Sequence, residues 1–338
     1  MKQTINSALL SEIATESVID WAYVWVCKQR HHYPHNADIW HFRYHWQTNK
    51  QSLIAKLRSG RYLFSPLQRI TLANGNIIHL WSAQDALVMK AIAIVLTPSL
   101  SISPRCTHTK GHGGLKGALR WLHRKLPFHR FVFRSDVKGY YQNIDHTILI
   151  KQLEQQVRNH DVMALLTQVI RRTVEWGGTF KTINRGVGRG SPLSPLFAAV
   201  YLKPLDDAMD QAGLSYVRYM DDWVVLSKTR WQLRRAVALV NRTLAALKLE
   251  KHPDKTWVGK IDRGVDFLAY HHTQAGCGPA KATLARFHAQ LTRLQEQGAR
   301  PARIGVYNTR WWRWVRAGLP KNLVLVIPTV SSAERDRS

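Results

Sequence analysis

Two adjacent carboxylates set within an apolar stretch constrain the fold of this chain more than any other feature. The pair Asp221-Asp222 follows the strand-like run Leu214–Met220, and a second such run, Trp223–Leu226, comes directly after it. This pattern predicts a β-hairpin with both aspartates at its tip. Adjacent carboxylates repel one another, and a divalent cation is the usual reason that such a pair is kept. The sequence therefore predicts a metal site on the hairpin.

A third carboxylate lies where such a site needs one. Asp136 ends the run Phe131–Asp136, which is expected to be a strand, so its side chain would project from the strand end into a turn. If this strand pairs beside the hairpin, the carboxylates converge and hold two Mg²⁺ ions about 3.5–4 Å apart, the arrangement used in phosphoryl transfer. Alternatively, Asp136 and nearby Asp145 are ordinary turn or helix-cap residues.

The overall charge points to a polyanionic partner. The chain has 49 Lys and Arg residues against 22 Asp and Glu, a formal net charge of +27, and nucleic acid is the natural counterion for such a balance. An anionic membrane surface would attract the same charge, but no apolar run is long enough to span a bilayer and no signal peptide opens the sequence. The three cysteines have no paired spacing, which favours neither a disulfide framework nor a Cys-based zinc site. We therefore expect a cytoplasmic protein with no membrane partner.

The length and hydrophobic content predict a large core divided among two or three lobes. A buried helix is expected over Ala83–Leu96, with Ser82 as its N-cap and its end before Pro98. A hairpin is expected at Ala73–Gly75. Further expected elements are helices over Leu9–Gln29, Lys50–Leu57, Leu196–Met209 and Leu284–Leu294, and a strand over Val265–Tyr270.

Five sequence blocks in a fixed order resemble those of the bacterial reverse transcriptases, most closely the group II intron type. They are Asp136 with Tyr140, Tyr141, Ile144 and His146; Gly190-Ser191-Pro192-Leu193-Ser194-Pro195; Tyr219-Met220-Asp221-Asp222; Pro253-Asp254-Lys255-Thr256; and Gly264-Val265-Asp266-Phe267-Leu268-Ala269-Tyr270. A lone Tyr-x-Asp-Asp block is a weak signal, whereas five blocks in order are a strong one.

The resemblance implies an α+β fold with the right-hand architecture of a polymerase. Fingers and an N-terminal helical region would take residues 1–127, a palm with an antiparallel sheet and helices residues 128–272, and a short helical thumb residues 273–330. Residues 331–338 look like a polar, disordered tail. Because the chain ends at Ser338, we expect a stand-alone polymerase without a maturase or endonuclease extension, with phage defence as a candidate role.

The resemblance also implies the catalytic residues. Asp136 and Asp221 would be the principal metal ligands, Asp222 would complete the acidic pair, and the backbone carbonyl of Val137 would add a ligand. The cofactor would be two Mg²⁺ ions, for which Mn²⁺ can substitute. The primer 3′-OH would attack the α-phosphate of a dNTP. Lys255 would protonate or electrostatically assist the departing pyrophosphate; alternatively, it is a solvated turn lysine.

A second group of residues would contact the nucleotide or the template. Tyr141, with Tyr140 beside it, stands where the family places an aromatic side chain under the sugar; a core tyrosine is the alternative. Gly190 and Ser191, before a helix start at Pro192, would lie against the template or the incoming nucleotide, because glycine lets backbone approach a ligand and a helix N-terminus favours anions.

The chain also departs from the family pattern. Arg189 replaces the neutral amide of the usual Pro-Gln-Gly block, which brings a cation near the nucleotide or the template. The family's triphosphate-gripping arginine in the fingers has no match, and Arg69 and His79 are the candidates for its role. The basic, glycine-rich stretch Ser103–Gly114 would cradle phosphates, or it is a flexible loop before a helix. The run Arg310–Arg316 interleaves arginines with tryptophans, which suits a nucleic-acid strand or a packed thumb core.

Three functional classes remain open. The first is an RNA-directed DNA polymerase whose partners are an RNA template, a DNA or RNA primer, dNTPs and a structured non-coding RNA. The second is a polymerase of the same fold that works without a template or primes from protein. The third is a non-catalytic RNA-binding or maturase-like factor, for which the basic surface alone would suffice.

Overall fold

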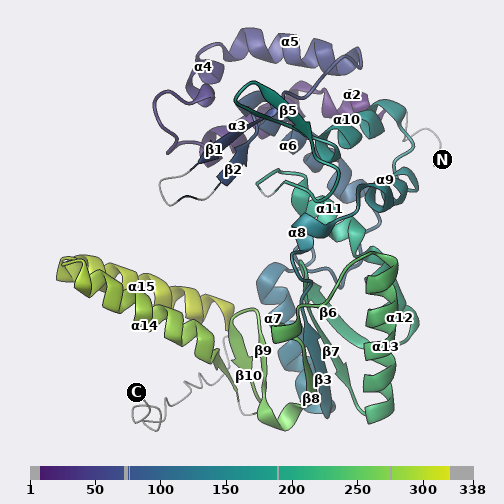
Figure 1. The fold of residues 1–338 in the computed structure, drawn as a ribbon, viewed down its shortest axis with the longest axis vertical. Coiled ribbons are helices and arrows are strands. Elements are labelled where there is room, and N and C mark those ends of the chain that lie inside the picture. The colour runs from purple at the N-terminus through teal and green to yellow at the C-terminus, as the bar shows by residue number, and fades with distance from the viewer. Residues whose placement is uncertain (1–7, 72–74, 76, 189, 275, 320–338) are drawn as a thin grey trace. The chain divides into compact units, whose positions relative to one another are not determined.

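The computed structural model describes residues 8–319 except 72–74, 76, 189 and 275, and it has a mixed α/β fold (Figure 1). The chain forms two compact units whose segments alternate along the sequence. The predicted tail lies outside the described residues. No helix in the described part of the chain is both long and apolar enough to cross a bilayer.

The first unit comprises Met1–Ser103, Lys138–Pro204 and Leu244–Glu250. Its sheet has the strand order β2-β1-β4-β5, in which β1 and β4 are parallel and the other neighbours are antiparallel. The strands are β1 (Leu67–Thr71), β2 (Ile77–Leu80), β4 (Thr173–Trp176) and β5 (Thr179–Thr182). The helices are α2 (Leu9–Ile13), α3 (Glu16–Gln29), α4 (Asp38–Tyr44), α5 (Trp46–Arg58), α6 (Ala83–Ser99), α8 (Tyr140–Asn143), α9 (His146–Glu154), α10 (His160–Ile170) and α11 (Ser194–Tyr201).

The second unit comprises Pro104–Val137, Leu205–Thr243 and Lys251–Ser338. Its main sheet is antiparallel throughout, in the order β6-β7-β3-β8. These strands are β3 (Phe131–Ser135), β6 (Ser215–Tyr219), β7 (Asp222–Ser227) and β8 (Trp257–Lys260). A smaller antiparallel sheet contains β9 (Val265–Phe267), β10 (Tyr270–His272) and β11 (Cys277–Pro279).

Helices cover the main sheet and complete the core of the second unit. Helix α7 (Gly114–Lys125) packs beside β6, because Ala118, Leu119 and Leu122 form an apolar stripe at helical spacing. This stripe joins Val132 of β3 and Val224 of β7 in one buried cluster. The remaining α-helices are α12 (Lys203–Gln211), α13 (Arg230–Ala246), α14 (Lys281–Glu296) and α15 (Pro301–Gly318). The chain passes from one unit to the other within α12 and again within α13.

Several sequence predictions are confirmed. The run Leu214–Leu226 folds into the antiparallel pair β6 and β7, as predicted. Ser82 caps α6, because its hydroxyl accepts a hydrogen bond from the Asp85 amide. The antiparallel pairing of β1 with β2 confirms the first hairpin, although Ala73 and Asn74 lie outside the described residues. Helices are also found at the predicted stretches Lys50–Leu57 and Leu284–Leu294.

The prediction that helix α6 ends before Pro98 is wrong. The helix continues to Ser99, with Pro98 in its last turn. A proline near a helix end removes only one backbone donor, so one further turn is tolerated. The hydroxyls of Thr97 and Ser99 donate to the carbonyls of Ala93 and Val95, which supplies hydrogen bonds in this turn.

Three other predicted elements are each divided in two. The helix over Leu9–Gln29 breaks at Thr15, whose backbone is extended and whose hydroxyl donates to the Glu12 carbonyl. The helix over Leu196–Met209 becomes α11 and α12, because Pro204 restarts the helix after Leu202. The strand over Val265–Tyr270 is a tight hairpin, since Leu268 and Ala269 adopt positive φ angles of 49° and 73°.

Candidate active site on the antiparallel sheet

The carboxylates meet because β3 lies between two antiparallel neighbours. In one register Ser135 is paired with Trp223 of β7, and in the other Arg134 is paired with Trp257 of β8. Continuing each register to Asp136 sets it opposite Asp222 on one side and opposite Lys255 on the other. The strand leading to Asp136 therefore pairs beside the hairpin, which is the condition set from the sequence for the carboxylates to converge.

The turn of the hairpin is held through the backbone of Met220. Tyr219 pairs with Asp222, so Met220 and Asp221 form a two-residue turn, and Met220 has a φ of 57°. This is the left-handed region, which non-glycine residues adopt at a cost. The Arg218 guanidinium donates to the Met220 carbonyl at 2.8 Å, and the Met220 amide donates to His108 Nδ1 at 3.1 Å. These two contacts hold the backbone of the turn that carries Asp221.

Behind the turn lies a buried ion pair. Arg218 Nε is 2.8 Å from Asp206 Oδ1, and Arg218 Nη2 is 2.5 Å from Asp206 Oδ2. Both side chains are fully buried, and the Tyr216 hydroxyl donates to Asp206 Oδ1. Two parallel charge-assisted bonds leave the guanidinium little freedom. The arginine that holds the turn is thus itself anchored in α12.

Cations of the chain lie against two of the carboxylates. Lys255 Nζ is 2.5 Å from Asp136 Oδ2, and Arg134 Nε is 3.8 Å from Asp222 Oδ1, which is beyond hydrogen-bond distance. The other oxygen, Asp136 Oδ1, and Asp222 Oδ1 are both buried without a hydrogen-bond partner. Burial raises the pKa of Asp222 to about 7, Arg134 opposes this shift, and the charges of Asp136 and Asp221 add to it. Two carboxylate oxygens of the site, Asp136 Oδ1 and Asp222 Oδ1, thus receive no hydrogen bond from the protein.

These residues fit a divalent cation. Unsatisfied carboxylate oxygens are hard donors, which Mg²⁺ and Mn²⁺ prefer. Within the described ranges, no group of three or more His, Cys, Asp or Glu side chains is already arranged to hold a metal ion. Lys255 occupies one carboxylate oxygen of Asp136 instead. Because an ammonium and a metal ion would compete for that oxygen, metal binding is expected to displace Lys255 from Asp136.

The backbone beside Asp136 is held by a β-bridge at Val137. Val137 is buried and forms a β-bridge with Lys251. The His252 amide donates to the carbonyl of Asp136 at this bridge, not to that of Val137. Asp145, in contrast, is the N-cap of α9 and pairs with Lys248, so the helix-cap alternative holds for Asp145.

The aromatic residues predicted to contact the nucleotide lie in the first unit. Tyr140 is 1% exposed, and its hydroxyl donates to the Ala198 carbonyl at 2.7 Å. This position gives Tyr140 a packing role in the core. Tyr141 is half-buried, and its ring lies edge-on to that of Tyr140. Only Tyr141 is partly open to a ligand.

The glycine block and the two candidates for the triphosphate grip, Arg69 and His79, also belong to the first unit. Gly190 has a φ of 88°, and the buried Ser191 hydroxyl lies 3.1 Å from the sulfur of Met89. Helix α11 begins at Ser194, so the predicted helix start at Pro192 is wrong. The Ser191 hydroxyl accepts a hydrogen bond from the Leu193 amide and forms a turn before the helix. Arg189 lies outside the described residues.

The two candidates for the triphosphate grip are neighbours on paired strands. Arg69 of β1 is opposite His79 of β2, and its guanidinium lies over the Trp176 ring at 3.9 Å. Burial lowers the pKa of His79, and the charges of Arg172 and Arg69 lower it further. His79 therefore stays neutral at physiological pH, which leaves Arg69 as the cation of this pair.

Four residues around the carboxylates did not emerge from the sequence: Arg134, Asp206, Arg218 and His108. One signal was present, because Arg134 and Arg218 each interrupt an apolar strand run just before an aspartate. A cation at such a position is rarely buried unless it is paired. No comparable signal marks Asp206 or His108, which reach the hairpin from distant parts of the sequence.

Comparisons with known proteins agree with the sequence blocks. A model of the family described as "Reverse transcriptase (RNA-dependent DNA polymerase)" matches residues 87–272. The chain is 23% identical to Protein YkfC of Escherichia coli K12 over 269 residues, which cover 65% of this chain and 70% of YkfC. It is 25% identical to the group II intron-encoded protein LtrA of Lactococcus lactis over 178 residues, which cover 50% of this chain and 29% of LtrA. A solved partial Cas6-RT-Cas1–Cas2 complex is similar at 24% identity and a TM-score of 0.44, covering 71% of this chain and 42% of that one.

Proposed function

Because the chain belongs to the reverse transcriptase family, we propose that it is an RNA-directed DNA polymerase that adds dNTPs to a primer 3′-OH. The observation that carries the proposal is the register of β3, which sets Asp136 opposite Asp222 beside the turn that contains Asp221. Carboxylates from two paired strand ends, with buried oxygens lacking partners, suit a metal-dependent phosphoryl transfer.

Asp136, Asp221 and Asp222 would hold the Mg²⁺ ions, with the Val137 carbonyl as a further ligand. When bound, the ions supply electrostatic stabilisation of the charge that develops on the attacking and leaving oxygens. The protein's part is to keep the three carboxylates in a fixed arrangement. The turn contacts from Arg218 and His108 do this for Asp221 and Asp222, and the central position of β3 does it for Asp136.

Lys255 would act on the phosphates. Its side chain is 51% exposed, although its ammonium pairs with Asp136. Once that carboxylate has another positive partner, the ammonium is available to pair with the triphosphate or with the departing pyrophosphate. A lysine on a flexible stem acts as a mobile point charge, which suits a partner that leaves during the reaction.

The polymerase layout completes the proposal. The sheet β6-β7-β3-β8 would form the palm within residues 128–272, the helices α14 and α15 the thumb within residues 273–330, and residues 1–127 the fingers. Tyr141 would lie under the sugar, and Gly190, Ser191 and Arg189 would lie near the template or the nucleotide. The net charge of +27 supports binding of a template, a primer and a structured RNA through their phosphates.

Primer extension on a defined RNA template with dNTPs and Mg²⁺ tests the proposal. Wild type should make DNA complementary to the template, and Asp221→Asn should lose roughly a hundredfold or more in rate because a charge at the reacting centre is removed. Asp262→Asn is the matched control, since Asp262 is an exposed aspartate of the same unit. It should extend the primer as wild type does.

The product distinguishes the three functional classes. Non-complementary DNA that depends on Asp221 would show untemplated or protein-primed synthesis. Equal activity of wild type and Asp221→Asn would show that this site is not catalytic. No product from either, with Mg²⁺ or Mn²⁺, would contradict the polymerase and favour an RNA-binding or maturase-like factor.

A further inference from the structure

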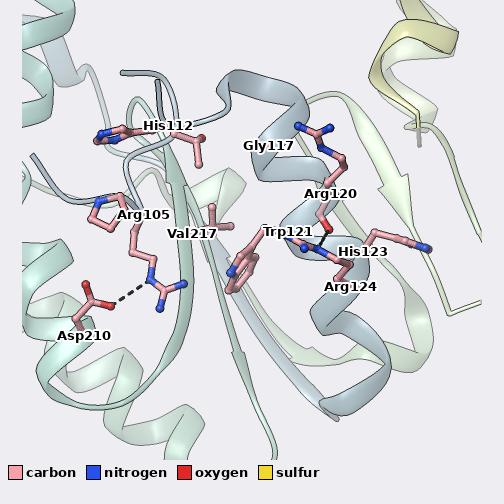
Figure 2. A pocket seen from close by; sticks show the side chains of 11 residues that line it. Arg105, His112, Gly117, Arg120, Trp121, His123, Arg124, Asp210 and Val217 are labelled. Atoms are coloured by element: carbon pink, nitrogen blue, oxygen red, sulfur yellow. Dashed lines mark hydrogen bonds and ion pairs between the residues drawn. The ribbon is translucent and has the colours of Figure 1, made fainter. Parts of the chain in front are cut away.

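A cavity of about 630 Å³ lies in the second unit, between α7, strand β6 and the loop that precedes α7 (Figure 2). Arg105 and Thr107 line it from the loop, Val217 from β6, and Trp121 from α7. None of the aspartates of the candidate active site is among its lining residues. Its volume is in the range of pockets that hold a molecule of nucleotide size.

The lining of the cavity is basic. Arg105, Arg120 and Arg124 contribute positive charge, and Asp210 is the carboxylate among the lining residues. Arg120 and Arg124 are exposed, so their guanidinium groups can reach an incoming anion. The partners of such a surface are phosphates or carboxylates, which arginine binds through paired hydrogen bonds.

Trp121 gives the cavity an aromatic wall. The indole packs partly against the buried cluster of α7 and the main sheet, which fixes its position. In Figure 2 the Arg105 guanidinium and the Trp121 ring extend toward one another from facing elements. A fixed aromatic face beside several arginines suits a ligand with a flat ring and a phosphate, because base stacking and phosphate contacts then act together.

The loop is itself fixed to the sheet. The Thr107 amide and hydroxyl both donate to the Arg218 carbonyl, and the Arg218 amide donates to the Arg105 carbonyl. Of the two sequence alternatives for Ser103–Gly114, these contacts favour an ordered cradle over a flexible loop. The cavity wall is therefore preorganised, which reduces the entropy cost of binding.

We propose that this cavity binds one nucleotide unit of a single-stranded nucleic acid, with the base against Trp121 and the phosphates at Arg105, Arg120 and Arg124. An acidic peptide would satisfy the arginines but would leave the aromatic wall without a planar partner, so the observations favour nucleic acid. This site goes beyond the proposed polymerase function and does not depend on the carboxylates. RNA and DNA share the chemistry, and the experiment separates them.

Substitution of Asp210 tests the proposal, because its removal is expected to increase the affinity for the nucleic acid. Its carboxylate lies 3.2 Å from Arg105, and the two side chains are 43% and 38% exposed. A bound phosphate would compete with this carboxylate and would be repelled by it. Asp210→Asn should therefore tighten binding by roughly two- to fivefold, the range for a partly exposed charge contact.

The experiment uses the full chain with a short oligouridylate that carries 4-thiouridine, and with its deoxy counterpart. Ultraviolet crosslinking followed by mass spectrometry should place the crosslink in α7. Anisotropy at about 200 mM salt, which suppresses purely ionic contacts, should show a roughly tenfold loss of affinity in Trp121→Ala. The exposed residues Arg120 and Arg124 allow a second variant, Arg120→Ser/Arg124→Ser, which should also weaken binding without disturbing the core.

Matched controls come from α13, where Trp231 and Arg235 are exposed. Trp231→Ala and Arg235→Ser should leave the α7 crosslink unchanged, and so should Asp221→Asn, which separates this site from the polymerase. Crosslinks spread over the basic surface without enrichment in α7 would overturn the inference. Equal losses in the cavity variants and the α13 controls would also overturn it, as would displacement of the oligonucleotide by polyglutamate of equal charge. Preference for the ribo- or the deoxyoligonucleotide identifies the strand that the site takes.

Discussion

Asp206 and Arg218 form a fully buried, doubly hydrogen-bonded ion pair, and the same guanidinium donates to the Met220 carbonyl at the turn before Asp221. One side chain thus connects the interior of the second unit to the turn that carries the acidic pair. Buried pairs of this kind contribute little net stability, but breaking one leaves an uncompensated charge. The pair therefore matters chiefly for the position of the turn.

Asp206→Asn should destabilise the protein by about 3–5 kcal/mol, because Arg218 would remain buried without its counter-charge. Urea denaturation followed by circular dichroism measures the change. The matched control is Asp210→Asn on the same helix, which breaks the exposed pair with Arg105 and should cost at most about 1 kcal/mol. An equal loss of unfolding free energy in the two variants would show that the buried ion pair matters no more to stability than the exposed one.

Lys255→Ala should change metal binding and catalysis in opposite directions. Removing the ammonium frees the Asp136 carboxylate, so the affinity for Mn²⁺ should rise by roughly two- to fivefold. The rate of primer extension should fall, because the phosphates lose a cation. Titration of Mn²⁺ by electron paramagnetic resonance and primer extension give the two readouts. Lys260→Ala, at the exposed end of the strand β8 that follows Lys255, should alter neither readout. A fall in both Mn²⁺ affinity and rate would contradict the proposed competition between Lys255 and the metal ion.

Gly318 allows close packing at the end of α15. A Cβ atom added there would overlap the Tyr270 hydroxyl group, which donates a hydrogen bond to the Val315 carbonyl. Gly318→Ala should therefore cost about 1–3 kcal/mol through overpacking. Gly305 lies in the same helix, and a methyl group added there would face open space, so Gly305→Ala should stabilise the helix by about 0.5–1 kcal/mol. Thermal unfolding of both variants tests this opposite pair of effects.

His272 should make the protein sensitive to acid. It is buried, and burial lowers its pKa to about 3, with the charges of His123 and His271 lowering it further. In the unfolded chain the His272 imidazole binds a proton with its ordinary pKa of about 6.5. The contribution of neutral His272 to stability is therefore present above pH 6.5 and is lost as the pH falls toward 3, by about 2 kcal/mol at pH 5.

The measurement is urea denaturation of wild type and His272→Leu at pH 7.5 and pH 5. The variant should lose less stability than wild type between the two pH values. His160→Leu is the control, because the His160 side chain is 96% exposed and its replacement should not change the pH dependence. The same acid loss in His272→Leu as in wild type would place the sensitivity elsewhere.

The hairpin and its neighbour could be predicted because their signals are local. Two apolar runs with two aspartates between them define β6 and β7, and the run before Asp136 defines β3. Lys255 also lay within a recognisable block. Its contact with Asp136 was not predictable, because it depends on the pairing of β8 with β3, which no local pattern encodes.

The sequence predictions that the structure corrects failed for a common physical reason. Leu268 and Ala269 form a tight turn with positive φ angles at residues that carry no turn signal, so tertiary pairing overrides local preference there. Likewise Tyr140 and Tyr141 look equivalent in sequence, yet Tyr140 is buried with its hydroxyl bonded to the Ala198 carbonyl, whereas Tyr141 is half-buried. Burial of one neighbour and partial exposure of the other follow from the packing of α8, which periodicity over four residues cannot specify.

The central place of β3 has a consequence for the newly synthesised chain. Both of its partners come later, β7 from Asp222 and β8 from Trp257, so Phe131–Ser135 leaves the ribosome with two unpaired edges and an apolar surface. Such a strand invites pairing with other chains until its own partners arrive. A translation product that stops before β8 contains all three aspartates without the complete sheet that holds them, so a truncated product is a candidate for aggregation rather than a slower enzyme.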